Sequence, residues 1–166
     1  MKELLVDKNG YEQFFEEFDK LKMSLTSNAA HGSEVYADAV GDGWHDNFAY
    51  EEAMRQEKMI QTKIMEMTKQ KDLLKVIDAV PYSDDYVCLD DKIEVAIKYS
   101  EDDEDIEIIK LTGKFRPDDD LNEVTLNSPI GKAIYKQAIG SNVIYEVNNK
   151  KIEVKILRKV NYYETS

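Results

Sequence analysis

The stretch YEQFFEEFDKLKMSL, residues 11–25, decides the fold of the first half of this chain. Its apolar residues follow one another at steps of three, four, three and four: Tyr11, Phe14, Phe18, Leu21 and Leu25. This heptad spacing places all five side chains on one face of a helix. Asp7 precedes the stretch and is a suitable cap for the start of that helix. The stretch therefore predicts an amphipathic helix with a single narrow apolar stripe.

A second stretch with heptad spacing extends from about Phe48 to Val76 without a proline or a glycine. Its stripe positions are Tyr50, Ala53, Glu57, Ile60, Ile64, Met67, Lys71 and Leu74. Between the two stretches lie residues 41–47, GDGWHDN, whose composition is typical of a turn. Two heptad helices joined by a short turn pack antiparallel. We therefore expect residues 1–78 to form an antiparallel coiled-coil hairpin, about 45 Å long at about 1.5 Å per residue.

Residues 79–166 change to the two-residue alternation of β-strands. The alternating segments are residues 92–99, 106–111, 142–147 and 151–157, and Asn148 and Asn149 form a hairpin turn between the last two. Ser128 and Pro129 predict the capped start of a short helix that continues to Ile134. Acidic clusters at residues 101–105 and 118–120 are expected as loops. The chain as a whole is predicted to be α+β, with a hairpin domain followed by an antiparallel sheet domain.

The charge balance excludes several classes of partner. Asp and Glu number 34 against 22 Lys and Arg, for a net charge of −12, so we expect no free DNA binding and no docking on anionic membranes. Residues 81–123 hold 15 acids and 5 bases, whereas residues 124–166 hold 3 acids and 7 bases.

The single cysteine, Cys88, allows no internal disulfide and no zinc site. The N-terminus has no signal-peptide pattern and no apolar run approaches a membrane span, which predicts a cytoplasmic protein.

Three motifs resemble one known family. The stretch LNSPIGKAI, residues 126–134, followed by Gly140 and a strand hairpin, resembles the C-terminal domain of the GreA/GreB transcript-cleavage factors. The stretch GDGWHDNFAY, residues 41–50, resembles the tip of that family's coiled coil, which has Gly-Asp, a second acid, Asn and Tyr in this order. Residues 10–22 resemble the start of the family's first helix. The resemblance covers nearly the whole chain, with all elements in family order.

The resemblance implies an architecture and a partner. Gre factors bind bacterial RNA polymerase at its secondary channel, with an FKBP-like C-terminal domain on the rim and the coiled coil in the channel. It implies that Ser128, Pro129 and Gly131 belong to the polymerase-docking element. The nascent RNA 3′ end would then be reached only through the polymerase.

The resemblance also implies a metal role for Asp42 and Asp46. In the family, two acidic tip residues help hold a second Mg²⁺ at the polymerase active site, where backtracked RNA is cut hydrolytically. Mg²⁺ prefers oxygen ligands, and two metal ions about 4 Å apart stabilise both oxygens of an in-line displacement. The hydrolysis belongs to the polymerase, and no motif of a free-standing enzyme appears in this chain.

The tip departs from the family pattern. Gly43, Trp44 and His45 separate the two aspartates where the family has two residues, and Asp46 stands where the family has the longer Glu. The alternative is therefore a non-cleaving Gre homologue that occupies the channel and regulates or inhibits the polymerase. Trp44, His45 and Asn47 would be tip contacts. For Trp44 a fold back onto the coiled coil, and for Asn47 a plain helix cap, are equally compatible with the sequence.

Two basic residues of the second helix, Arg55 and Lys58, lie nearest to the tip. In the family a basic patch on the coiled coil helps hold the RNA 3′ end, which implies this role for them. The alternative is a mixed-charge, solvated helix face. A third possibility for the whole chain is a coiled-coil adaptor or chaperone unrelated to polymerase.

Overall fold

The computed structural model describes residues 3–39, 47–78, 81–100 and 103–160, with the backbone alone for residues 31–39, 47 and 49. In chain order the elements are β1 (Leu4–Val6), α1 (Lys8–Ala39), α2 (Asn47–Lys71), β2 (Leu74–Val76), β3 (Lys92–Ser100), β4 (Asp103–Thr112), the 3₁₀ helix η1 (Asp119–Leu121), β5 (Glu123–Thr125), α3 (Pro129–Ile134), β6 (Asn142–Val147) and β7 (Lys150–Lys159). They form two compact units. One is Phe14–Leu74, and the other combines Glu3–Gln13 with the chain from Lys75 onward.

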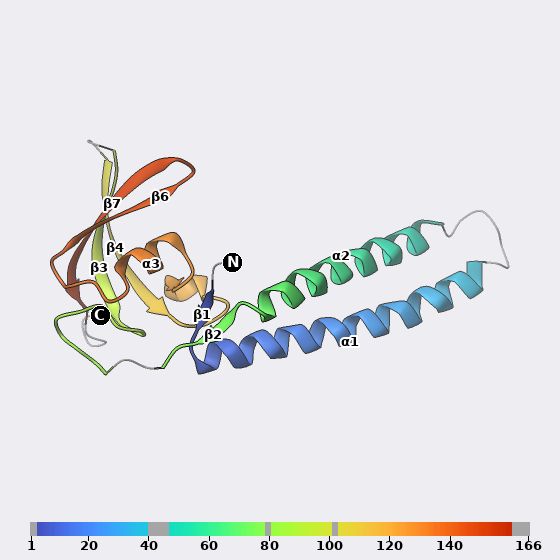
Figure 1. Cartoon of the computed structure of the whole chain (residues 1–166). Coiled ribbons are helices and arrows are strands. Elements are labelled where there is room, and N and C mark those ends of the chain that lie inside the picture. The colour runs from blue at the N-terminus through green and yellow to red at the C-terminus, as the bar shows by residue number, and fades with distance from the viewer. Residues whose placement is uncertain (1–2, 40–46, 79–80, 101–102, 161–166) are drawn as a thin grey trace. The chain divides into compact units, whose positions relative to one another are not determined.

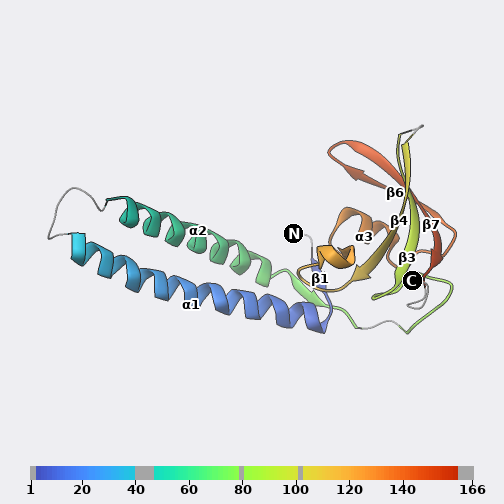
Figure 2. The same ribbon diagram turned by 180° about the vertical axis from the view of Figure 1, so that it is seen from behind.

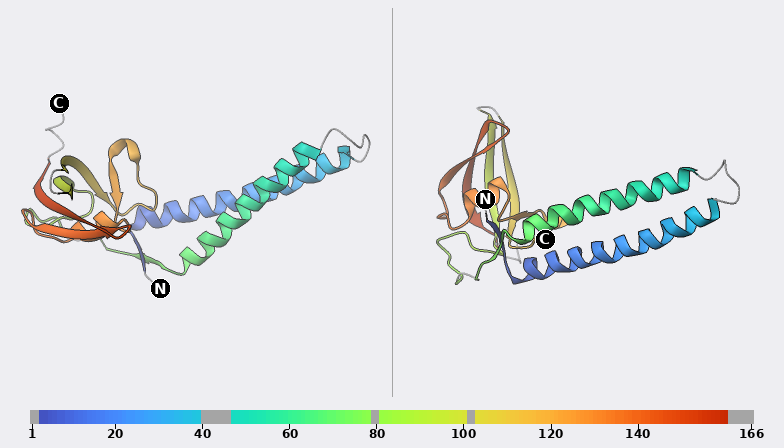
Figure 3. Two further views of the ribbon diagram at one scale, coloured as in Figure 1. Left: turned by 90° about the horizontal axis from the view of Figure 1, so that it is seen from above. Right: turned by 45° about the vertical axis from the view of Figure 1, so that its right-hand side comes forward.

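The first unit is the predicted helical hairpin. Helices α1 and α2 run antiparallel in every view (Figures 1 and 3). The heptad stripe faces inward: Phe14, Phe18 and Met67 are buried, and Leu21, Leu25, Tyr50, Ala53, Glu57, Ile60 and Ile64 are half-buried. Lys63 of α2 pairs with Glu17 of α1, at 3.3 Å between Nζ and Oε1. The heptad spacing therefore predicted both helices and most of the faces that they bury. At the ends of the two stripes Tyr11, which belongs to the other unit, and Lys71 are exposed instead.

The ends of the hairpin differ from the prediction in one respect. Helix α2 ends at Lys71, and Leu74 belongs to strand β2 instead of the helical stripe. Strand β2 pairs with β1 in a two-stranded sheet, and Ile77 N donates to Val6 O at 2.8 Å. The heptad spacing continued through Leu74, but the partner strand β1 lies far earlier in the chain, at Leu4–Val6, and leaves no local signal.

The start of α1 belongs to the second unit and is capped as predicted. The Asp7 carboxylate accepts from Gly10 N at 2.6 Å, and Asp7 N donates to Gly113 O at 2.9 Å. A Cβ on Gly10 would overlap the Gly113 carbonyl oxygen and lie 2.9 Å from Phe115 N. Glycine is thus required here by the close approach of two backbones.

The second unit is built on a curled five-stranded sheet of order β5-β4-β3-β7-β6, with α3 beside β6 (Figure 2). The pairs β4–β3, β3–β7 and β7–β6 are antiparallel, whereas β5 pairs with β4 in parallel. Asn148 and Asn149 have φ of 51° and 63°, the left-handed values of a two-residue hairpin turn. The core of this unit consists of Val87, Ile93, Val95, Ile97, Ile109, Leu111, Leu126, Ile134, Val154 and Ile156.

Two features of the sheet differ from the sequence-based expectation. The acidic residues Asp103, Glu104 and Asp105 are not a loop but the first part of β4. Strand β5 and its parallel pairing were not predicted. Both depend on neighbouring strands: β3 supplies the partner for the acidic segment, and the long connection 113–122 brings β5 alongside β4.

Candidate functional site

The tip of the hairpin lies mostly outside the described residues. Asp42, Trp44, His45 and Asp46 all fall in the connection 40–46, and Asn47 is the first residue of α2. Helix α1 ends at Ala39, so the two aspartates stand between the two helices in the chain, as the sequence predicted. Their role as Mg²⁺ ligands stays a prediction.

The predicted RNA-proximal residues, Arg55 and Lys58, share one groove on α2. This groove of about 580 Å³ is lined by Glu51, Met54, Arg55, Glu57, Lys58 and Gln61. Arg55 pairs with Glu52 at 3.0 Å, and both side chains are more than a third exposed. Exposed pairs of this kind contribute little stability, about 0–1 kcal/mol, so the Arg55 guanidinium is available to a competing anion.

The predicted docking residues build the start of α3. Ser128 Oγ accepts from Gly131 N at 3.0 Å and donates to Thr125 O at 2.7 Å. This is the N-cap that the sequence predicted, with Pro129 at the first helical position. Pro129 is exposed, Ser128 is half-buried and Gly131 is buried. Of the three, Pro129 therefore presents the most surface to a partner, while Ser128 and Gly131 shape the element from within.

Gly131→Ala tests this local architecture. A Cβ on Gly131 would overlap the Thr125 carbonyl oxygen and lie 2.9 Å from Ser128 Oγ. We expect the variant to lose about 2 kcal/mol of the free energy of unfolding, because α3 must shift to relieve the overlap. The buried Cys88 thiol is the only one in the chain, so its labelling rate by a thiol reagent measures the opening of this unit.

Pro129→Ala is the matched control for that measurement. Its side chain is exposed on the same helix, so we expect a change within about 0.5 kcal/mol. If Gly131→Ala labels no faster than Pro129→Ala, the close approach at Gly131 does not constrain α3.

Asn127, which precedes the docking motif, was not predicted as important. Its side chain accepts from Leu5 N at 2.9 Å and donates to Leu5 O at 2.7 Å. The amide therefore completes the hydrogen bonding of β1 next to the Ser128 cap. The two residues are far apart in sequence, and a single Asn before Ser-Pro indicates only a turn.

Glu123 was also missed, and it organises the connection before α3. Its carboxylate, fully buried, accepts from Lys114 at 2.8 and 2.9 Å, from Lys110 at 3.1 Å and from Asp118 N at 2.9 Å. Burial opposes ionisation of this carboxyl, but the hydrogen bonds from Lys114, Asp118 N and Lys110 outweigh it and lower its pKa. In the sequence Glu123 is one acid among many in an acidic segment, and nothing local distinguishes it.

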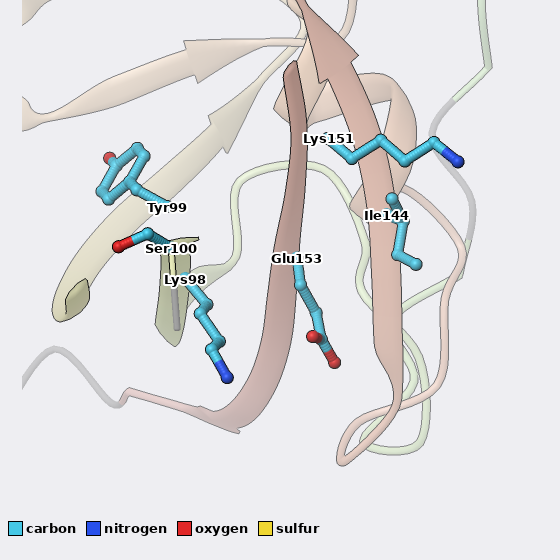
Figure 4. A pocket seen from close by; sticks show the side chains of 6 residues that line it. All are labelled: Lys98, Tyr99, Ser100, Ile144, Lys151 and Glu153. Carbon is cyan, nitrogen blue, oxygen red and sulfur yellow. The ribbon is translucent and has the colours of Figure 1, made fainter. Parts of the chain in front are cut away.

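A shallow hollow of about 300 Å³ lies over strands β3, β7 and β6 (Figure 4). Figure 4 shows Lys98 and Glu153 pointing in the same direction from adjacent strands, while Tyr99 points to the other side. Register places Ile144, Glu153, Lys98 and Glu104 in one row across the sheet. Its charged lining consists of Lys98, Lys151 and Glu153, and its small volume and shallow form give it no enclosed binding site.

The described residues contain no further candidate for a metal or membrane site. Within them no three His, Cys, Asp or Glu side chains gather as a metal site would require. None of the helices in the described ranges is long and apolar enough to cross a membrane.

Comparison with known proteins gives consistent results. Residues 84–162 match the family model described as "Transcription elongation factor, GreA/GreB, C-term". A transcription elongation factor GreA of Prosthecochloris aestuarii is 24% identical over 155 residues, covering 93% of this chain and 94% of the relative. A transcription elongation factor GreA of Neorickettsia sennetsu is 26% identical over 161 residues, covering 95% and 96%. Among solved structures, one described as that of the transcription factor Gfh1 is 15% identical with a TM-score of 0.44, covering 97% of this chain and 100% of that one.

The family match contains the motif at residues 126–134, and the alignments with the two GreA relatives extend over nearly the whole chain. The helical hairpin and the curled sheet with its short helix are also arranged in the predicted order. The matched C-terminal segment and the relatives that align with nearly the whole chain show that this protein is a divergent member of the GreA/GreB family of transcription elongation factors.

Proposed function

We propose that this Gre-type factor binds bacterial RNA polymerase through the secondary channel and stimulates cleavage of backtracked RNA. The observation that carries the proposal is the placement of Asp42 and Asp46 between two long antiparallel helices. At about 1.5 Å per residue, the 32 residues of α1 and the 25 residues of α2 are about 48 and 38 Å long. Helices of this length suit a hairpin that carries two carboxylates into a narrow channel.

The chemistry of the tip follows from its donor set. Two aspartate carboxylates are hard oxygen ligands of the kind that Mg²⁺ prefers. A second Mg²⁺ would supply charge stabilisation for the attacking and leaving oxygens of RNA hydrolysis in the polymerase. The part of this chain is to deliver Asp42 and Asp46, so it is not an enzyme by itself.

The remaining predicted residues have roles compatible with this function. Arg55 and Lys58 line a single exposed groove on α2, where they would contact phosphates of the RNA 3′ end. Pro129, with Ser128 and Gly131 shaping α3 beneath it, would contact the rim of the channel. RNA would be reached only within the polymerase, in the cytoplasm, without free DNA or membrane binding.

A second candidate function is supported by one feature of the tip. The aspartates are separated by three residues instead of two, and Asp46 has one methylene less than the Glu of the family motif. Mg²⁺ demands near-ideal octahedral geometry, so this change disfavours a shared ion. The chain would then occupy the channel, with Trp44 as a tip contact, and regulate or inhibit the polymerase.

A cleavage assay on stalled elongation complexes separates the two functions. Backtracked complexes with RNA labelled at the 3′ end are mixed with the protein and Mg²⁺. Release of short labelled 3′ fragments above the polymerase's intrinsic rate supports the proposal. Displacement of an authentic GreA without such fragments supports the regulator. If the protein neither releases fragments nor competes with GreA, both proposals fail.

A further inference from the structure

Strand β4 has an open edge along its acidic half. In the order β5-β4-β3-β7-β6, strand β5 pairs only with Lys110, Leu111 and Thr112 of β4. From Asp103 to Ile109 the strand therefore pairs with β3 on one side, and no described strand lies on the other. This leaves a row of main-chain groups accessible to another chain.

The hydrogen bonds of β4 show which residues face that edge. Leu111 N donates to Asp91 O at 3.0 Å on the β3 side, whereas Lys110 N donates to Asn122 O at 3.1 Å on the opposite side. Ile108 O accepts from Asn122 Nδ2 at 2.6 Å, also on the opposite side. Along a strand the N–H and C=O groups of successive residues point alternately to its two sides. The main-chain groups of Ile106 and Glu104 therefore point away from β3, like those of Ile108. No residue in the described ranges bonds to those groups.

Apolar side chains accompany the open edge. Ile106 is 66% exposed and Ile108 is 39% exposed. Register places Ile106 opposite Ala96 and Ile108 opposite Glu94, on the same sheet face as Lys98. Two exposed isoleucines on a sheet edge are an unusual arrangement, because natural edges are normally short, covered or fully charged.

Carboxylates occupy the other face of the same segment. Asp103, Asp105 and Glu107 alternate with the isoleucines and lie near Tyr99. Burial raises the pKa of Tyr99, and the negative charges of Glu107, Asp105 and Asp103 raise it further. Within the described part of the chain none of these three carboxylates has an ion-pair partner, so no ion pair neutralises their negative charges.

We propose that the open edge of β4 accepts an extended, basic segment of another protein as an added strand. Main-chain hydrogen bonds to Glu104 and Ile106 would supply affinity, as in other complexes formed by strand addition. On one face of the added segment, apolar side chains would lie beside Ile106. On its other face, Lys or Arg side chains would lie beside Asp105 and Glu107. A second copy of this chain is a poor occupant, because its own β4 edge carries the same negative charges. The proposal does not depend on the cleavage function or on the α3 docking element.

A designed peptide provides the probe for this edge. It is an acetylated and amidated hexapeptide of alternating valine and lysine, mixed with the full-length protein at about 50 mM salt, where charge attraction is weakly screened. We expect amide shift changes confined to residues 103–108 and slower hydrogen exchange of the Ile106 N–H. A peptide with both central amides N-methylated should bind at least about tenfold more weakly. Successive amides of an extended peptide point to its opposite edges, so one hydrogen-bond donor is lost whichever edge faces β4.

Two matched variants test the site on the protein. Ile106 and Ile144 are equally exposed, both at 66%, and lie on strands β4 and β6, which are separated by β3 and β7 in the sheet order. We expect Ile106→Lys to weaken peptide binding about tenfold and Ile144→Lys to change it less than twofold. Both replacements are at exposed positions, and the labelling rate of Cys88 verifies that the fold is retained.

Four results would overturn the proposal. They are no peptide binding, equal binding of the N-methylated peptide, equal loss in the Ile144→Lys variant, and dimerisation of the protein through residues 103–108. The first result would mean that the acidic residues only protect the edge from self-pairing. The second and third would mean a diffuse charge attraction, and the fourth would identify a second copy as the occupant.

Discussion

Asp46→Ala is expected to abolish stimulated RNA cleavage, lowering its rate by at least about 100-fold, while polymerase binding stays within about twofold. Removing an outer partner of a metal ligand already costs about 10- to 100-fold in affinity or activity, and Asp46 is proposed as a direct ligand. Binding should persist because the proposed docking residues, Ser128, Pro129 and Gly131, belong to the other unit of the chain. The two quantities are measured on backtracked complexes, by release of 3′ fragments and by competition with an authentic GreA.

Two variants provide controls for this prediction. Glu66→Ala removes an exposed carboxylate from α2 outside the groove of Arg55 and Lys58 and should leave cleavage unchanged. Asp46→Glu restores the longer side chain of the family motif and should preserve or increase cleavage. Loss of cleavage in Glu66→Ala to the same extent would mean that the general negative charge of the hairpin acts, and not a metal ligand. Full activity of Asp46→Ala would remove this residue from the proposed site.

Glu123→Gln is expected to have the largest effect on stability, a loss of about 3 kcal/mol at pH 7. The replacement leaves Lys110 and Lys114 without the fully buried carboxylate between them, and breaking a buried pair costs about 3–5 kcal/mol. It also weakens the acceptor of Asp118 N and so loosens the connection 113–122. Urea unfolding followed by Cys88 labelling measures the loss in this unit.

The same variant predicts a pH dependence with a definite sign. The folded-state pKa of Glu123 lies below its ordinary value of 4.5, so the ionised carboxylate stabilises the fold above that pH. This contribution is lost as the pH falls through the lowered folded-state pKa, because protonation then removes the charge that Lys114 and Lys110 bind. The difference in stability between wild type and Glu123→Gln should therefore be largest at neutral pH and shrink on acidification.

Glu94→Gln is the matched control for Glu123. Glu94 accepts from Arg158 at 2.9 Å in the same sheet, but the Arg158 side chain is about half exposed. We expect a loss below about 1 kcal/mol, because water screens the pair. Equal losses in the two variants would show that burial of Glu123 does not strengthen its interactions.

Much of the fold and part of the site could be predicted because their signals are local. Helical spacing in residues 11–25 and 50–67, the caps at Asp7 and Ser128 and the hairpin turn at Asn148 each depend on residues close in sequence. The motifs at residues 41–50 and 126–134 likewise lie within single elements or turns. The acidic start of β4 was misjudged as a loop because its charges resemble those of a solvated turn. Its strand conformation depends on pairing with β3, which no local pattern reports.

The sequence by itself determined the two kinds of secondary structure, their order, and the position of Asp42 and Asp46 between two helices. Periodicity and capping act over three to seven residues, so their physical causes are visible in the chain. Only the tertiary structure decided that Asn127 bonds to Leu5, that Glu123 is buried between Lys110 and Lys114, and that β4 keeps an open edge. These features depend on which distant segments meet, and the energy of each contact exists only once the sheet has formed.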